Sequence, residues 1–274
     1  MTPPLVQFTV TDAPLLLELS ESIGWPHEIG DWQTTLAASQ VFGHRAADGK
    51  VVSSASIYQF GPTLSALAVV LVREDFRRQG LARAAVLKCL DQVAGIPQML
   101  VATPFGQPLY KSLGFKVAEQ IVRLIAVEGT SLPLTGRVRP MTDADLPRVL
   151  ELDREIYQAD RSQVLRHRWK QTQGAVMLAD GSGYAWKIPQ RGGLVLGPIV
   201  ATTPQDAASL VAHLTIGFPG RIKIEVSERH TGLMTTLKVA GFVVDSARPL
   251  MLNNIEQLPG RRELLFGLAS LGFC

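Results

Sequence analysis

The clearest pattern in the chain is an apolar run without polar alternation at 66–72, ALAVVLV. Such a run is typical of a strand that is buried on both faces, whereas a half-exposed strand alternates. A charged loop with a glycine, REDFRRQG, follows the run, and helical spacing of apolar residues begins at about Gly80. We therefore predict a central strand, a loop and a helix over residues 66–90.

The predicted loop has the composition of an anion-binding site. Gly80 lets the backbone come close to a ligand. The first N–H groups of the helix lack intrahelical partners and carry the positive end of the helix dipole. Arg77, Arg78 and Arg83 add positive charge around them. A solvated basic loop explains the same residues equally well, because short glycine motifs are weak signals when they stand alone.

The rest of the first half predicts a mixed sheet with helices on its faces. Asp48-Gly49 lies between two apolar segments and is a strong hairpin signal. A loop at 24–32 is rich in aromatic and ionisable residues. The predicted order is strand, two helices, three strands with the last feeding a helix, then strand, helix and strand. This order suits an α/β fold.

The pattern then begins again, which predicts two domains of the same fold. Residues 128–136 have the composition of a linker, and Gly114-Phe115 and Gly241-Phe242 end equivalent predicted helices. We expect a first domain over residues 1–130, a second over residues 137–252, and a C-terminal tail over residues 253–274 that packs on the second domain.

Two motifs together resemble the GNAT acetyltransferase superfamily. Residues 77–82, RRQGLA, match its phosphate loop, Arg/Gln-x-x-Gly-x-Gly/Ala, and residues 109–115, LYKSLGF, match its Tyr…Gly-Phe helix. The resemblance implies tandem GNAT-like folds of the α/β (α+β) class, with mixed, mostly antiparallel sheets. The second half is similar to the accessory domain of some bacterial two-domain GNAT proteins. It lacks the phosphate loop and has Leu237 in place of Tyr110, so we expect only the first half to bind the cofactor.

The resemblance implies acetyl-CoA as the co-substrate. Its pyrophosphate would lie on the N–H groups of the loop, and its pantetheine arm beside the central strand. A backbone N–H near Leu71 or Val72 could then polarise the thioester carbonyl, which is typically worth about 3 kcal/mol per donor. We expect cofactor contacts from Val70, Leu71, Val72, Arg77, Arg78, Gln79, Gly80, Leu81, Ala82 and Arg83.

Acyl transfer to an amine also requires two proton movements. Tyr110 is the candidate acid that protonates the departing thiolate. Many GNAT enzymes carry a glutamate on the central strand, but here that strand is wholly apolar. His27 and Glu28 are therefore candidate bases, and a water relay or an acceptor amine that is already neutral would serve equally well.

Candidate substrate-binding residues lie in both halves, and each has a structural alternative. Trp25 and Trp32 could wall an acceptor or pack in the core. Asp31 lies in the loop expected to border the acceptor cleft. Asp153 and Arg161 could reach over this cleft from the second half, or they could form a helix-surface ion pair.

Composition removes several other classes of function. The net charge is only +3, and the 19 arginines are scattered along the chain, which argues against nucleic-acid binding. Two cysteines make no disulfide framework, and the histidines lack metal spacing. No signal peptide or apolar stretch of membrane-spanning length is visible, so we expect a cytoplasmic protein with no metal and no membrane contact.

The leading hypothesis is an acetyl-CoA-dependent N-acetyltransferase. It would act on the amine of a small molecule or amino-acid derivative by direct attack in a ternary complex. The alternative is a CoA-binding sensor or scaffold with lapsed catalysis, which the missing strand glutamate favours. The sequence is compatible with a monomer or a homodimer.

Overall fold

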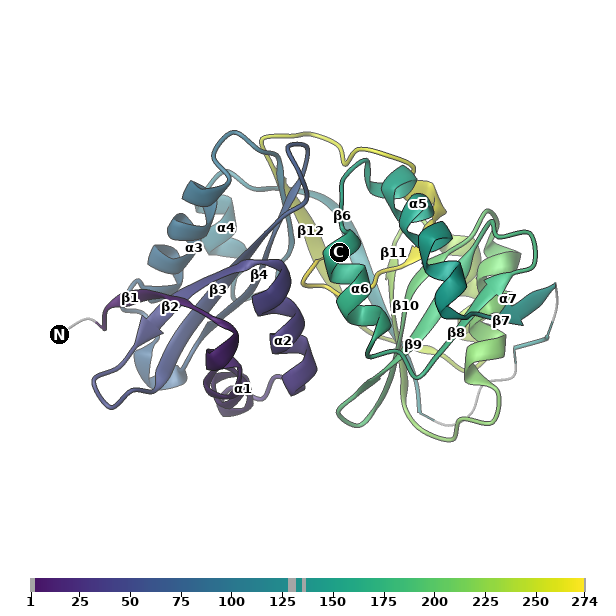
Figure 1. The fold of residues 1–274 in the computed structure, drawn as a ribbon, viewed down its shortest axis with the longest axis horizontal. Coiled ribbons are helices and arrows are strands. Elements are labelled where there is room, and N and C mark those ends of the chain that lie inside the picture. Colours follow the sequence, from purple (N-terminus) through teal and green to yellow (C-terminus); the bar gives the residue numbers. More distant parts are fainter. Residues whose placement is uncertain (1–2, 128–131, 135–136, 274) are drawn as a thin grey trace.

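The computed structural model describes residues 3–127, 132–134 and 137–273, so most of the predicted linker lies outside the described residues. Within these residues, 13 strands form one sheet with helices on both faces (Figure 1). Two strand pairs, β4–β5 and β10–β11, are parallel and the others are antiparallel. The predicted mixed, mostly antiparallel fold is therefore confirmed.

The first half of the chain contains six strands and four helices among the described residues. The strands are β1 (Leu5–Phe8), β2 (Gln40–Arg45), β3 (Val51–Gln59), β4 (Ser65–Val72), β5 (Gln98–Val101) and β6 (Lys116–Ala126), and the helices are α1 (Ala13–Ser22), α2 (Ile29–Ala38), α3 (Leu81–Gln92) and α4 (Gln107–Ser112).

The second half repeats this order and adds a short final strand. Its strands are β7 (Val138–Pro140), β8 (Gly174–Leu178), β9 (Tyr184–Gln190), β10 (Gly193–Val200), β11 (Ile222–Ser227), β12 (Val243–Asn253) and β13 (Leu265–Gly267), and its helices are α5 (Leu146–Tyr157), α6 (Ser162–Trp169), α7 (Pro204–Thr215) and α8 (Thr231–Val239).

The two halves end their last helices in the same way. Gly114 after α4 and Gly241 after α8 both adopt a left-handed φ, 92° and 100°. The next residue, a phenylalanine in both halves, donates its N–H to the carbonyl of Tyr110 in one case and of Leu237 in the other, at 3.0 Å. This is a glycine-terminated helix end, and it shows that Leu237 occupies the position of Tyr110.

The halves exchange one strand through the middle of the sheet. β6 pairs with β11 on one side and with β12 on the other, and β12 continues the sheet of the first half by pairing with β5. Each half therefore completes the core of the other. Met251 of β12 is buried among first-half residues, and Leu124 of β6 is buried among second-half residues.

Strands β4 and β5 separate soon after they begin. Only Ser65 and Ala66 of β4 pair with β5, so the later part of β4 has no strand partner on that side among the residues that the structure describes. On its other side β4 bulges against β3, where the register shifts and Val69 adopts a φ of 41°. Positive φ is rare for a β-branched residue. The bulge is held by Ser54, whose hydroxyl donates to the Val69 carbonyl at 2.7 Å.

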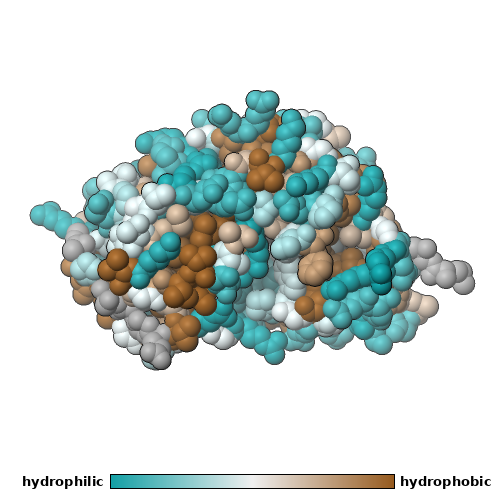
Figure 2. All heavy atoms as spheres, turned by 180° about the vertical axis from the view of Figure 1, so that it is seen from behind, coloured by the Kyte–Doolittle hydropathy of each residue, from teal (hydrophilic) through white to brown (hydrophobic). Residues whose placement is uncertain are grey.

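The C-terminal tail contacts both halves. β13 pairs with β10, and the residues after β13 continue toward the first half, where the Phe273 ring lies 5.7 Å from the Tyr58 ring. In Figure 1, α6 lies beside α2 at the boundary between the halves. From behind, apolar side chains gather on the second half, at left in Figure 2, and most of the remaining visible surface is polar.

Candidate active site

The loop between β4 and α3 has the backbone geometry of an anion site. A short 3₁₀ turn at Glu74–Phe76 leads into it, and Arg78 and Gly80 both have a left-handed φ, 61° and 80°. Gly80 caps α3, and its carbonyl accepts the N–H of Ala84. The N–H groups that precede Ala84 in the first turn lack an intrahelical acceptor. They lie at the positive end of the helix dipole, where an anion is stabilised.

The arginines of this loop are placed at its margins. Arg77 forms an ion pair with Glu74 at 3.1 Å, and Arg83 donates to the Ser112 hydroxyl at 3.2 Å. Arg78 is exposed. The backbone therefore forms the centre of the site, and the side chains surround it with positive charge.

A cavity of about 530 Å³, here called the loop cavity, lies beside this loop. The end of β4, the loop, the start of α3 and the segment that leads into α4 form its walls. Nine of the ten residues expected to contact the cofactor line it: Val70, Leu71, Val72, Arg77, Arg78, Gly80, Leu81, Ala82 and Arg83. Gln79 is absent from the lining, and its side-chain amide donates to the Asp75 carbonyl at 3.5 Å.

A second cavity of about 400 Å³ lies between the two halves and is called the interface cavity. Its walls include α2, α6, the C-terminal tail and the central strands β6, β11 and β12. These three strands, where the two halves meet, are called the seam of the sheet. The two cavities share four lining residues, Trp25, Val70, Thr103 and Tyr110. A ligand in one cavity would thus meet a ligand in the other beside Tyr110 and the β4 bulge.

Tyr110 is held in place by close packing. It is 7% exposed, and its ring lies 6.1 Å from that of Phe115. At Gly106 a Cβ atom would lie only 2.8 Å from the Tyr110 ring, so glycine is required there. Burial raises the pKa of the phenol far above its usual value. At neutral pH Tyr110 is therefore protonated, and its hydroxyl has no hydrogen-bond partner recorded among the described residues.

His27 borders the interface cavity as a neutral imidazole. Its Nδ1 lies 2.8 Å from the hydroxyl of Ser20, and its ring lies between those of Trp25 and Trp32, at 5.4 and 5.6 Å. Burial lowers the pKa of His27, although the Asp31 carboxylate opposes this shift. Trp32 is buried, donates its indole N–H to Ser20 at 2.9 Å, and lines neither cavity.

Glu28 and Asp31 have different positions although both lie at the start of α2. Glu28 is exposed and lines neither cavity, and its backbone N–H donates to the Asp31 carboxylate at 2.9 Å. This contact satisfies one of the N–H groups that a helix start leaves open. Asp31 lines the interface cavity.

Asp153 and Arg161 form a buried pair that lines neither cavity. Two guanidinium nitrogens lie 2.6 and 3.1 Å from the carboxylate. The guanidinium also lies 3.4 Å from the centre of the Tyr157 ring, and it donates to the Phe273 carbonyl at 2.6 Å. The pair therefore holds the C-terminal tail, and the tail residues 269–273 line the interface cavity in its place.

A row of charged side chains at the seam of the sheet was not predicted from the sequence. Register places Glu225 of β11 opposite Arg123 of β6, and Arg248 of β12 opposite the residue two positions before Arg123. Residues two apart share a face of a strand, so Lys223 points the same way. All four line the interface cavity. The alternation in IKIEVS at 222–227 is the signal that marks the two residues of β11 as partners on one face.

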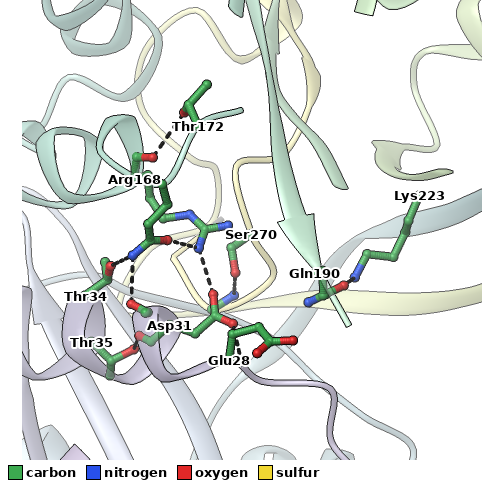
Figure 3. Close-up of polar contacts among 12 residues, drawn as sticks. Glu28, Asp31, Thr34, Thr35, Arg168, Thr172, Gln190, Lys223 and Ser270 are labelled. Atoms are coloured by element: carbon green, nitrogen blue, oxygen red, sulfur yellow. Dashed lines mark hydrogen bonds and ion pairs between the residues drawn. The ribbon is translucent and has the colours of Figure 1, made fainter. Parts of the chain in front are cut away.

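Arg168 of α6 closes the opposite wall, and it was not predicted either. Figure 3 shows it reaching from α6 to Asp31 on α2, with the Lys223–Gln190 pair to the right of them. Both pairs line the interface cavity. Gln171, one turn after Arg168, donates to the Gly30 carbonyl and the Thr34 hydroxyl, both at 2.8 Å. These contacts fix the second half against α2.

No candidate metal site is present in the described part of the chain. That part contains no group of three or more His, Cys, Asp or Glu side chains placed to hold an ion. None of the described helices combines the length and apolarity needed to cross a membrane.

Comparison with known proteins assigns both halves to one family. Residues 13–115 match the model of the acetyltransferase (GNAT) family, and residues 149–267 match that of an acetyltransferase (GNAT) domain. The uncharacterized N-acetyltransferase YitH of Bacillus subtilis (strain 168) is 26% identical over 264 residues, which is 93% of each chain.

Solved structures share the whole two-domain arrangement. A putative acetyltransferase from Pyrococcus horikoshii aligns with a TM-score of 0.85 at 15% identity, covering 100% of this chain and 96% of that one. A tandem GNAT protein from the clavulanic acid biosynthesis pathway aligns with a TM-score of 0.63 at 14% identity, covering 91% and 98%. The protein described here belongs to the GNAT family. It is a two-domain N-acetyltransferase.

Proposed function

We propose that this enzyme transfers the acetyl group of acetyl-CoA to the amine of a small molecule, by direct attack in a ternary complex. The cofactor occupies the loop cavity, and the acceptor occupies the interface cavity. The observation that carries the proposal is that the two cavities share Val70 and Tyr110 in their walls. Reactants held in contact in this way react as if at a very high concentration.

The cofactor is bound mainly by backbone groups. The N–H groups around Gly80 and Leu81 hold the pyrophosphate, and the part of β4 that lacks a partner strand bonds the amides of the pantetheine arm. We place the donor to the thioester carbonyl at the Val69-Val70 bulge rather than at Leu71 or Val72. The reason is that Val69 and Val70 line the interface cavity, whereas Leu71 and Val72 line only the loop cavity.

The chemistry then follows a balanced sequence. The neutral amine attacks the thioester carbonyl carbon, the carbon–sulfur bond breaks, and the thiolate takes the proton of the Tyr110 hydroxyl. The nitrogen loses one proton as the amide forms. The products are the acetylated amine and CoA, and Tyr110 recovers its proton from solvent.

His27 accepts the proton of the amine, directly or through a water molecule. The lowered pKa of this residue keeps the ring unprotonated at neutral pH, and the ring borders the interface cavity. Glu28 lines neither cavity and takes no part in this mechanism. Strand β4 contains no acidic residue and supplies no carboxylate for this purpose.

The test is release of CoA thiol from acetyl-CoA across a panel of small amines, together with a direct measurement of CoA binding. The proposal expects CoA to bind and at least one amine class to stimulate thiol release above the rate without amine. Tight CoA binding with no turnover on any amine would contradict it and favour a CoA sensor. Absence of CoA binding would remove the cofactor site altogether.

A further inference from the structure

The charges that face the interface cavity do not balance. Four cationic side chains line it, from Arg123, Arg168, Lys223 and Arg248, against two carboxylates, Asp31 and Glu225. Both carboxylates are already engaged. Asp31 lies 2.7 Å from Arg168, and Glu225 lies 2.7 Å from Arg123. Within the described residues, neither Lys223 nor Arg248 forms an ion pair of its own, and both share the attraction of Glu225 with Arg123.

These two cations are not ordinary surface charges. The Lys223 ammonium donates to the neutral amide oxygen of Gln190. Burial lowers the pKa of Lys223 to about 8, although the Glu225 carboxylate opposes this shift. Burial and Arg123 also lower the pKa of Arg248. A cation that is partly withdrawn from water without an ion pair of its own carries a desolvation cost, and an incoming anion reduces this cost.

The two cations line the same cavity as Val70 and Tyr110, which border the proposed site of reaction. They flank Arg123 on β11 and β12, on the face of the sheet that borders the interface cavity. Val70 and Tyr110 belong to the part of the same cavity that it shares with the loop cavity. One small molecule can thus present an amine to the reaction and an anionic group to the seam.

We propose that the acceptor is a small amine that also carries an anionic group, with a carboxylate as the expected form, and that Arg248 and Lys223 bind this group. The inference rests on the proposed function of the interface cavity as the acceptor site. Arginine binds a carboxylate or a phosphate through parallel hydrogen bonds, so the experiment includes both anions.

The experiment compares matched amines that differ only in the anionic group. γ-Aminobutyrate is paired with butylamine, and phosphoethanolamine with ethanolamine, within a wider panel of amino carboxylates and their decarboxylated counterparts. We expect kcat/KM of the wild-type enzyme to be about 10- to 100-fold higher for the anionic member of a pair, the usual range for a hydrogen bond to a charged group. Preference for the phosphate pair would support the anion site and assign its ligand to phosphates.

Three variants assign the effect to the seam. Arg248→Gln and Lys223→Met should each remove most of the preference for the anionic member of a pair, chiefly through KM. Arg248→Lys keeps the charge and should retain part of the preference. Arg221→Gln is the matched control, because Arg221 is an exposed arginine just before β11 that lines neither cavity.

Failure of this inference differs from failure of the proposed function. Equal use of neutral and anionic amines by the wild type, or equal loss for both in Arg248→Gln, would overturn the inference and leave acetyl transfer intact. If no amine is acetylated, calorimetry of γ-aminobutyrate binding decides the matter. Binding that Arg248→Gln weakens would support the anion site, and binding that it does not change, or none, would reject it.

Discussion

The guanidinium of Arg168 lies 2.7 Å from the carboxylate of Asp31, and this pair joins α6 of the second half to α2 of the first across the interface cavity. The Arg168 side chain is 7% exposed and that of Asp31 is 24% exposed. Removal of one member therefore leaves a largely buried charge without its partner, which costs about 3 kcal/mol or more when burial is complete.

Asp31→Asn should lower the free energy of unfolding by about 2 kcal/mol, less than the fully buried case because Asp31 is partly solvated. It should also raise KM for the acceptor more than KM for acetyl-CoA, since α2 borders only the acceptor side. Urea denaturation and steady-state kinetics measure these effects. Asp12→Asn is the control: it breaks the Arg45–Asp12 pair, which lies at 2.6 Å and lines neither cavity. Equal KM changes in both variants would contradict the assignment.

Gly80→Val should abolish CoA binding and leave the protein folded. Gly80 has a φ of 80°, which valine adopts only with strain of about 1–2 kcal/mol, and the new side chain stands where the phosphate would meet the backbone. Gly95→Val is the matched control. Gly95 has a φ of 81°, a Cβ atom added there would have no atom within 4 Å, and the residue lines neither cavity. Calorimetric titration with CoA measures the difference. Unchanged affinity in Gly80→Val would count against the loop.

Tyr110→Phe should lower kcat by about 100-fold or more while CoA affinity changes little, because it removes the proton donor and keeps the packing. The high pKa of Tyr110 also means that the wild-type rate should not decline through deprotonation of this group below about pH 10. Tyr184→Phe removes a phenol that is buried in the second half and lines neither cavity, and it should leave kcat unchanged. An undiminished kcat in Tyr110→Phe would take Tyr110 out of the mechanism.

Because His230 is buried, the protein should be less stable in mild acid than at neutral pH. The His230 ring packs 4.2 Å from that of Phe266, and burial lowers its pKa to about 4 from 6.5. Between these pH values His230 is protonated in the unfolded chain and neutral in the folded protein. The free energy of unfolding therefore falls as pH decreases from 6.5 toward 4. The loss is about 2 kcal/mol at pH 5.

Urea denaturation at pH 7.5 and pH 5.0 measures this loss. His230→Phe cannot bind the proton, so its free energy of unfolding should change less between the two pH values than that of the wild type. His213→Phe changes a histidine on α7 whose Nδ1 lies 2.8 Å from the Ser209 carbonyl, and it serves as the histidine control. Identical pH dependence in the wild type and His230→Phe would exclude His230 as the cause.

Local patterns predicted the parts of this protein that depend on neighbours in the chain. The apolar run at 66–72 became β4, and Gly80 became the cap of α3. The second Gly-Phe pair marked the internal repeat, which the equivalent hydrogen bonds of α4 and α8 confirm. Each of these features follows from spacing or from the φ that one residue must adopt.

Residues that act through distant contacts were harder to assign. The sequence leaves Asp153 and Arg161 open as substrate contacts or as a surface ion pair, and only packing shows that they are buried against the C-terminal tail. Lys223 and Glu225 stand in an alternating strand, yet the sequence does not say what that strand faces. Arg168 and Arg248 carried no local signal at all.

The sequence by itself determined the tandem fold and the position of the glycine-capped loop before α3, because these depend on short-range periodicity and on glycines at defined positions. The family followed from the resemblance of two motifs, RRQGLA and LYKSLGF. The tertiary structure alone decided that β6 and β12 cross between the halves and that a charged row lies at their seam. Strand exchange is settled by which edges pair and which apolar faces become buried together, and these are interactions between residues more than a hundred positions apart.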